Sequence, residues 1–287
     1  MPSEARDSVA IVGGGTMGTG MVYVFAAAGF DTILVEPDSA RQDAVAHQLA
    51  KAAENGVARG KLSAQQQRAV TSGVETLEDA GQLPKNLGLV IETVPERLEV
   101  KQSVLRAISQ RTPKLIASNT SAMSIDQLSS FVAEPENFLG MHFFNPVWSL
   151  PLVEIIRGNV TGDAVLASAR AYAEAIGKTS ITVSDTPGFA TSRLDLITAM
   201  EAIRMVEDGV ASPEDIDRAM VLAYRHPIGP LRLSDIVGLD VRLDIARGLS
   251  ETLGPRYAPP RILEDMVARG DLGQKTGRGF YHWTEAA

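Results

Sequence analysis

The sequence predicts an α/β domain followed by an all-α domain. Short apolar segments alternate with helical segments up to about residue 185, and a glycine-rich turn follows the first of them. Almost no strand pattern appears beyond residue 185. Because strands that alternate with helices build parallel sheets, we expect an α/β domain over residues 1–185 and a helical domain over residues 186–287.

The composition is that of a globular protein long enough for two domains. The chain has 287 residues, of which 45% are hydrophobic and 22% charged, and a formal net charge of −8. That charge argues against a nucleic-acid or anionic-membrane partner. The absence of cysteine excludes disulfides, thiolate nucleophiles and cysteine-ligated metals. We expect a cytoplasmic protein, since no signal-peptide or transmembrane pattern is present.

The first two elements enclose a glycine turn. Val9–Val12 predicts a short buried strand, and residues 21–28 predict an apolar helix. Between them, Gly13, Gly15 and Gly18 have the spacing G-x-G-x-x-G. In such a turn the first glycine permits a tight bend, the second lets a pyrophosphate approach, and the third allows close packing of helix on strand. Because helix N-termini attract anions, the turn predicts a dinucleotide site.

The next strand, residues 30–35, ends at an acidic residue, Glu36. Its separation from Gly13 is close to the roughly 20 residues expected for an acid that binds a ribose 2′-hydroxyl. A carboxylate at this place repels a 2′-phosphate, so the sequence predicts NAD rather than NADP. The alternative is a glycine turn between a core strand and a core helix, with Glu36 merely exposed to solvent.

The remaining elements of the α/β domain follow in order. We expect helices over residues 38–54, 98–110, 124–131 and 163–177, and strands over residues 87–92, 114–117 and 179–183. Two polar loops, Thr93–Glu96 and Ser118–Ser121, follow strands of this sheet. Ligands lie outside the carboxyl ends of strands in such sheets, so both loops are candidates for binding. The short side chains of the second loop equally suit capping of the next helix.

One window of this acidic chain is basic. Between Lys51 and Arg68 it holds four basic residues and one acid, Glu54. A phosphorylated substrate could bind there, and a solvated helical hairpin explains the window equally well.

A histidine and a glutamate lie in neighbouring apolar segments. His142 ends one of them and is followed by the turn Asn145-Pro146, and Glu154 stands within the segment 152–156. A buried unpaired carboxylate is costly, so Glu154 should have a partner. We therefore predict a His–Glu pair, in which the carboxylate orients the imidazole and stabilises its protonated form. The alternative is a purely structural histidine.

Four helices are expected beyond residue 185. They cover residues 189–207, a stretch that begins at Ser212-Pro213, residues 231–250 and the surroundings of Ile262–Val267, with a glycine-rich tail over residues 273–281.

Taken together, these motifs resemble the L-3-hydroxyacyl-CoA dehydrogenases in their single-function bacterial form, the 3-hydroxybutyryl-CoA dehydrogenase type. The resemblance covers nearly the whole chain. It is carried by Gly13-x-Gly15-x-Met17-Gly18, Glu92-x-x-Pro95-Glu96, Ser118–Ser121, His142–Pro146, Leu152-Val153-Glu154, Asp185–Phe189, His226–Pro230 and Lys275–Tyr281.

The resemblance implies a Rossmann-like domain that binds NAD and a helical domain that forms a homodimer. It implies oxidation of an L-3-hydroxyacyl-CoA, of short chain length, to the 3-ketoacyl-CoA. In that reaction His142 is the general base, Glu154 is its partner, and Ser121 hydrogen-bonds the reacting oxygen of the substrate. The implied cofactor-binding residues are Gly13, Gly15, Thr16, Met17, Gly18, Glu36, Glu96, Lys101, Asn145 and Lys275.

Two further residues are assigned to the substrate. The family usually has asparagine where Ser192 stands, so Ser192 takes that catalytic and substrate-binding position with a shorter reach. Lys61 falls where the family's helical hairpin meets the CoA phosphates. No metal site is expected, because no histidine or carboxylate cluster has ligand spacing.

Two other functions compete with this one. The first is a dehydrogenase of a non-CoA 3-hydroxy acid, such as a sugar acid or a carnitine-like substrate, on the same scaffold. The second is a non-enzymatic NAD-binding protein. Ser121, His142 and Glu154 argue against the second, since binding alone requires no His–Glu pair.

Overall fold

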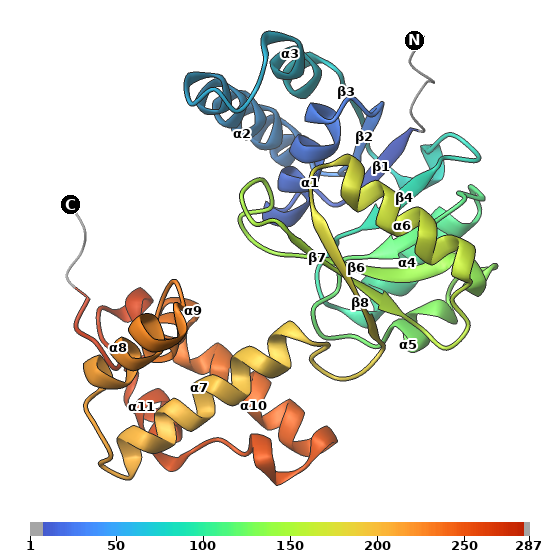
Figure 1. Cartoon of the computed structure of the whole chain (residues 1–287). Coiled ribbons are helices and arrows are strands. Elements are labelled where there is room, and N and C mark those ends of the chain that lie inside the picture. Colours follow the sequence, from blue (N-terminus) through green and yellow to red (C-terminus); the bar gives the residue numbers. More distant parts are fainter. Residues whose placement is uncertain (1–7, 284–287) are drawn as a thin grey trace. The chain divides into compact units, whose positions relative to one another are not determined.

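An eight-stranded sheet is the centre of the first part of the chain (Figure 1). The computed structural model describes residues 8–283, and the chain divides into two units, Met1–Thr186 and Pro187–Ala287. The first unit contains the sheet, and the second is built of helices. The predicted fold class, an α/β domain followed by an all-α domain, is confirmed.

The sheet has the topology of a doubly wound fold. Its strands are β1 (Val9–Val12), β2 (Thr32–Val35), β3 (Val74–Leu77), β4 (Leu89–Glu92), β5 (Ile116–Ser118), β6 (Phe138–Phe143), β7 (Leu152–Arg157) and β8 (Thr179–Ser184). They lie in the order β3-β2-β1-β4-β5-β6-β7-β8, and only β6 and β7 are antiparallel neighbours. The order reverses between β1 and β4, the kind of switch point at which ligands bind. The sequence did not predict β3, an edge strand with only partly buried residues.

Helices cover both faces of this sheet. They are α1 (Thr16–Ala27), α2 (Ser39–Ala58), α3 (Ala64–Ser72), α4 (Leu98–Ser109), α5 (Ile125–Ser129) and α6 (Asp163–Ala175). Phe25 of α1 and Leu166 of α6 share one buried cluster with Ile91 of β4. The next residue of β4, Glu92, contacts Lys101 of α4 instead. Since successive strand residues point to opposite faces, α4 covers the face away from α1 and α6.

The turn between β1 and α1 brings three backbone segments close together. Gly13 has a φ of +112°, and a Cβ there would lie 2.8 Å from the carbonyl oxygen of Thr93. A Cβ on Gly18 would lie only 1.8 Å from the carbonyl oxygen of Gly13, so α1 can begin this close to β1 only with glycine at that position. A Cβ on Gly15 would meet no atom within 4 Å, so the turn is open on that side.

The second unit contains five α-helices among its described residues. They are α7 (Thr191–Glu207), α8 (Pro213–Tyr224), α9 (Pro230–Val237), α10 (Leu239–Leu253) and α11 (Arg261–Arg269). The single helix predicted over residues 231–250 is wrong, because Gly238, with a φ of +104°, ends α9 and separates it from α10. Between residues 8 and 283 no helix is long and apolar enough to cross a membrane.

The glycine-rich tail is fastened to this unit by a buried aspartate. Asp235 of α9 is fully buried and accepts hydrogen bonds from the N–H groups of Phe280 (3.0 Å) and Tyr281 (2.9 Å) and from the indole of Trp283 (2.8 Å). A Cβ at Gly279 would lie 2.1 Å from the same carboxylate, so glycine is needed there for the tail to reach it.

A Gly18→Ala variant should lower the free energy of unfolding by about 2 kcal/mol, because its methyl group would overlap the Gly13 carbonyl. Gly15→Ala is the matched control, since it adds the same methyl group to the same turn, at a φ of −73° and facing open space. Urea denaturation of both variants measures the difference. Equal stability losses would contradict this account of the turn.

Candidate active site

A cavity of about 790 Å³ opens at the carboxyl ends of β1, β4, β5 and β6. It collects side chains and backbone from segments far apart in the sequence. The predicted site residues that line it are Gly13, Gly15, Thr16, Met17, Glu36, Glu96, Lys101, Ser121 and His142. Gly18 is buried at the base of the same turn. The first unit alone therefore brings most of the predicted cofactor residues together.

The carboxylate of Glu36 is fixed against the glycine turn. Oε2 accepts a hydrogen bond from the N–H of Gly14 (2.8 Å), and Oε1 accepts one from the N–H of Asp38 (3.1 Å). A Cβ on Gly14 would lie 2.9 Å from Oε2, so glycine admits the carboxylate to this place. No role for Gly14 was predicted from the sequence. Glu36 is 7% exposed and lines the cavity, so the alternative of a merely solvated acid is not supported.

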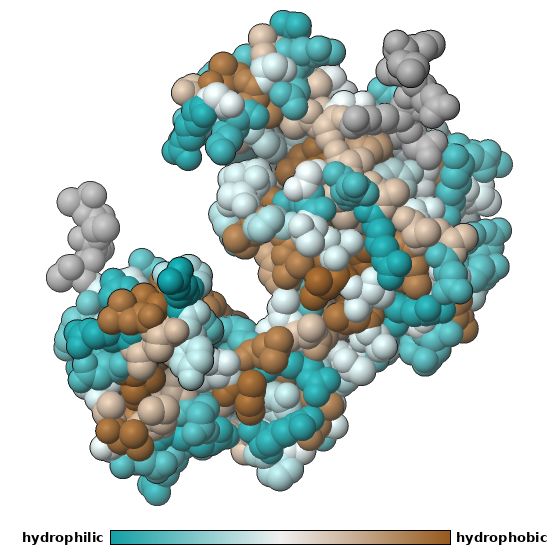
Figure 2. Space-filling model, viewed as in Figure 1, coloured by the Kyte–Doolittle hydropathy of each residue, from teal (hydrophilic) through white to brown (hydrophobic). Residues whose placement is uncertain are grey.

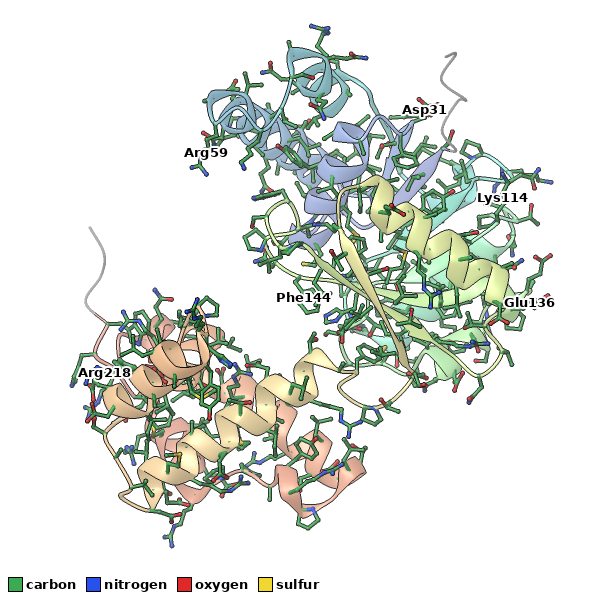
Figure 3. All side chains as sticks on the ribbon, viewed as in Figure 1. Asp31, Arg59, Lys114, Glu136, Phe144 and Arg218 are labelled. Carbon is green, nitrogen blue, oxygen red and sulfur yellow. The ribbon has the colours of Figure 1, made fainter. Side chains whose placement is uncertain are left out.

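His142 and Glu154 form a hydrogen bond between two strands. They are directly opposite in the antiparallel pair β6–β7, and Nδ1 of His142 lies 2.8 Å from Oε2 of Glu154. Glu154 is fully buried, and His142 is 8% exposed, at the wall of the cavity. The ring of Phe144, labelled in Figure 3, lies 4.5 Å from the imidazole. The carboxylate holds the Nδ1 side of the ring, which leaves Nε2 as the nitrogen that can exchange a proton with a ligand.

Glu96 connects two loops at the cavity. Its carboxylate accepts hydrogen bonds from the hydroxyl of Thr120 (2.9 Å) and the N–H of Ser121 (2.8 Å). Its side chain is 41% exposed, so oxygen lone pairs remain accessible to a ligand. The loop Ser118–Ser121 is thus joined to the loop after β4, while a different residue, Ser124, caps α5.

Beneath the cavity lies a buried ion pair that the sequence did not predict. Glu92, the last residue of β4, and Lys101 of α4 are 0% and 1% exposed, and their charged groups lie 2.8 Å apart. The Glu92 carboxylate also accepts hydrogen bonds from the hydroxyl group of Ser118 (2.7 Å) and from the N–H of Val94 (2.7 Å). Lys101 was predicted only as a cofactor contact, whereas its ammonium group binds Glu92 at the end of β4 and also lies 3.4 Å from the carboxylate of Glu96 in the loop that follows.

Asn119 is another residue whose role was not predicted. Its side-chain oxygen accepts the N–H of Phe143 (2.9 Å), which ties the end of β5 to the residue after His142. Asn119 also lines the cavity. The only signal in the sequence was its place in the polar loop Ser118–Ser121.

Besides Gly18 and Glu154, four predicted residues do not line this cavity. Asn145 is exposed and does not line it, and Lys61 lines a second cavity near the end of α2. Ser192 and Lys275 belong to the helical unit, where Ser192 lies in the first turn of α7 and Lys275 binds Asp240 at 2.5 Å. The hydrogen bond from Lys275 lowers the pKa of Asp240.

The cavity suits a dinucleotide by its own chemistry. The start of α1 presents backbone N–H groups beside the open space at Gly15, and Glu36 stands where a ribose hydroxyl would be accepted. Across residues 8–283 no three histidine, aspartate or glutamate side chains are grouped so that they could hold a metal ion.

Comparisons with known proteins agree with this geometry. The model for the 3-hydroxyacyl-CoA dehydrogenase NAD binding domain matches residues 8–186, and the model for the C-terminal domain of the same enzymes matches residues 188–283. The chain is 38% identical to a 3-hydroxybutyryl-CoA dehydrogenase of Mycobacterium tuberculosis, over 97% of this chain and 99% of that protein. It is 35% identical to the human mitochondrial hydroxyacyl-coenzyme A dehydrogenase, over 96% of this chain and 90% of that protein.

Solved structures give the same result. The crystal structure of the (S)-3-hydroxybutyryl-CoA dehydrogenase PaaH1 from Ralstonia eutropha matches with a TM-score of 0.92 and 36% identity, covering 97% of this chain and 99% of that chain.

The buried ion pair can be tested by a double-mutant cycle. Lys101→Met should lower the free energy of unfolding by about 3–5 kcal/mol, because it leaves the Glu92 carboxylate buried without its countercharge. Glu92→Gln added to Lys101→Met should recover part of that loss. Urea denaturation of Lys101→Met, of Glu92→Gln and of the double variant gives the coupling energy. Additive effects would contradict the ion pair as a structural unit.

Proposed function

The chain belongs to the 3-hydroxyacyl-CoA dehydrogenase family, and we propose that His142 and Glu154 are its catalytic pair. The protein is an NAD-dependent oxidoreductase that converts an L-3-hydroxyacyl-CoA to the 3-ketoacyl-CoA. The single observation that supports the pair is the 2.8 Å hydrogen bond between a fully buried carboxylate and an imidazole at the cavity wall. The alternative of a non-CoA 3-hydroxy acid substrate is not favoured by these relatives.

In the proposed mechanism His142 takes the proton of the substrate's 3-hydroxyl group at Nε2. Bound NAD would supply the acceptor for the hydride that leaves C3 of the substrate. Glu154 holds Nδ1–H, keeps the ring oriented, and stabilises the positive charge that the imidazole acquires. In the reverse direction the protonated His142 returns its proton to the carbonyl oxygen. Ser121, at the mouth of the same cavity, hydrogen-bonds the reacting oxygen.

Glu96, Lys101 and Glu36 support cofactor binding in different ways. Glu36 accepts a ribose hydroxyl from a position fixed by Gly14, and Glu96 offers its exposed oxygen to the second ribose. Lys101 holds the loop that carries Glu96, through its contacts with Glu92 and Val94 and through its ion pair with Glu96 itself (3.4 Å). Asn145, Lys275 and Ser192 remain proposed contacts, since they lie outside the cavity of the first unit.

We propose a short acyl chain, because the bacterial relatives are named for 3-hydroxybutyryl-CoA. The CoA part of the substrate fits the second cavity of the first unit, about 800 Å³ in volume, near the end of α2. Arg59 and Lys61 line it, and no ion-pair partner is found for either among residues 8–283. Two unpaired cations suit the phosphate groups of CoA.

We also propose that the protein forms a homodimer through its helical unit. Several large apolar residues of that unit are exposed, and Figure 2 shows hydrophobic areas among polar ones on its visible face. The exposed apolar residues of this unit include Leu194, Leu222, Tyr224, Ile236 and Val241. A second copy of the chain could bury such side chains, which supports the proposed dimer. The cytoplasmic location stays a prediction from the sequence.

A His142→Gln variant should lower kcat by at least about 10²-fold, because positioned proton transfer is lost. Its dissociation constant for NAD should change little, since His142 touches the reacting centre and not the nucleotide. Acetoacetyl-CoA reduction followed by NADH absorbance gives kcat, and fluorescence titration gives the dissociation constant. Phe144→Leu, next to the imidazole but without a titrating group, is the matched control. Near-normal turnover of His142→Gln would refute the assignment.

A Glu36→Gln variant should reduce the preference for NAD over NADP by about tenfold or more, because it removes the charge that repels a 2′-phosphate. The ratio of kcat/KM values with the two cofactors measures the change. The Asp38→Asn variant alters a neighbouring exposed carboxylate and should leave that ratio nearly unchanged. An unaltered ratio in Glu36→Gln would show that this carboxylate does not discriminate between the 2′-hydroxyl of NAD and the 2′-phosphate of NADP.

A further inference from the structure

Lys178, between α6 and β8, is a buried lysine with 9% of its surface exposed. Its ammonium group donates to the carbonyl oxygens of Val147 (2.5 Å) and Leu150 (2.7 Å). Burial lowers its pKa, and none of the described carboxylates forms an ion pair with it. Burial of an ammonium group is unfavourable unless its N–H groups form hydrogen bonds. Here the ammonium donates two hydrogen bonds to the loop between β6 and β7, which indicates that the lysine holds that loop.

The loop in question, Pro146–Leu150, joins β6 to β7 and therefore follows His142 and precedes Glu154. The Val147 side chain is buried and packs on Gly20 of α1, where a Cβ would lie 2.7 Å from the Val147 Cβ. The N–H groups of Ser149 and Leu150 both lie 3.1 Å from the carbonyl oxygen of Pro146. Together with the two Lys178 contacts, these interactions give the loop one conformation.

This conformation places an exposed tryptophan at the second cavity. Trp148 is 50% exposed, and its ring stands edge-on to Tyr23 of α1, with 5.8 Å between centroids and 62° between planes. Both rings line the cavity of about 800 Å³ that Arg59 and Lys61 also line. The half-exposed indole therefore offers part of its apolar surface to a ligand in this cavity.

The cavity therefore combines flat aromatic surface with unpaired positive charge. Arg59 follows the last residue of α2, and Figure 3 shows it at the end of that helix. Aromatic rings that stack on a base, together with cations that bind phosphate, are the means by which proteins hold a nucleotide. The substrate of the proposed function carries such a nucleotide at the end of CoA.

We propose that Trp148 is a specificity-determining residue that packs against the adenine of the acyl-CoA substrate, and that Lys178 is the positioning residue that holds Trp148 there. This rests on the proposed function, because the adenine belongs to CoA. The contact between Trp148 and the adenine adds binding energy at a place distant from the reacting carbon of the substrate. Loss of Trp148 therefore affects substrates with the nucleotide and spares substrates without it.

The test compares acetoacetyl-CoA with acetoacetyl-N-acetylcysteamine, a thioester that lacks the nucleotide, both with NADH. Trp148→Ala should raise KM for acetoacetyl-CoA about tenfold, within what base–aromatic stacking supplies, with kcat changed less than about twofold. The preference for acetoacetyl-CoA over the truncated thioester, as a ratio of kcat/KM values, should fall by the same factor. Trp148→Phe, which keeps an aromatic face, should restore most of it.

Leu150→Ala is the matched control. Leu150 lies in the same loop and is exposed, but its side chain does not line the cavity, and its carbonyl oxygen remains available to Lys178. The preference ratio should stay near the wild-type value in this variant. If Leu150→Ala lowers the ratio as much as Trp148→Ala does, the indole has no specific role and the proposal is overturned.

Lys178→Met should lower the preference ratio as Trp148→Ala does, and Lys178→Arg, which keeps the donors, should recover part of it. Lys178→Gln has no charge to bury and a shorter side chain that can reach fewer of the carbonyl oxygens that Lys178 binds, so it should give an intermediate loss, and it replaces Lys178→Met if that variant does not fold. The pair Lys178→Met with Trp148→Ala should be no worse than either alone, because both act through the indole. Additive losses would mean that Lys178 acts independently of Trp148.

Fluorescence tests binding without turnover. The chain has two tryptophans, so Trp283→Phe leaves Trp148 as the single emitter. Coenzyme A itself should quench and shift that emission, with a dissociation constant that rises about tenfold when Lys178→Met is added. No response to coenzyme A would overturn the inference even in an active enzyme. An enzyme inactive on both thioesters that still shows quenching would instead refute the proposed function.

Discussion

The hydrogen bond between His142 and Glu154 is the interaction on which the chemistry of the candidate site depends. It forms because the register of β6 and β7 places these two residues directly opposite each other. These strands are the only antiparallel neighbours in the described sheet. A shift of one residue in this register would turn one side chain to the other face. The polar pair thus depends on the apolar packing of Met141, Phe143, Val153 and Ile155 on either side of it.

Buried charge is used in the same way elsewhere in the chain. Glu92 is paired with Lys101 beneath the cofactor cavity, Lys178 holds two carbonyl oxygens, and Asp235 holds the tail of the helical unit. Each of these groups is almost fully buried. Lys178 and Asp235 fasten a loop and a tail, and the Glu92–Lys101 pair joins β4 to α4 where the loop after β4 begins. Because an unpaired buried charge is strongly unfavourable, each contact selects one conformation of a segment that has no ladder of backbone hydrogen bonds. The loops around the two cavities are thereby held in place against the sheet.

Much of the architecture could be predicted from local patterns. Four-residue apolar strands, the glycine turn and the Ser212-Pro213 helix start are short-range signals, and the structure contains each of them. The errors have physical causes. The edge strand β3 lacks an apolar pattern because it is half exposed, and the break between α9 and α10 depends on the positive φ of Gly238. The partner of Glu92 was missed, although the cost of a buried unpaired carboxylate applies to Glu92 as it does to Glu154.

The sequence by itself determined the fold class, the glycine turn with its acid, the pairing of His142 with Glu154 and the family resemblance, because these depend on residue type and short spacing. Only the tertiary structure decided that Gly14 admits Glu36, that Lys101 pairs with Glu92, and that Lys178 holds the loop of Trp148. These contacts join segments whose meeting depends on strand order and loop path. Sequence spacing carries little information on either, since the same side chains could be solvated or buried until the sheet brings them together.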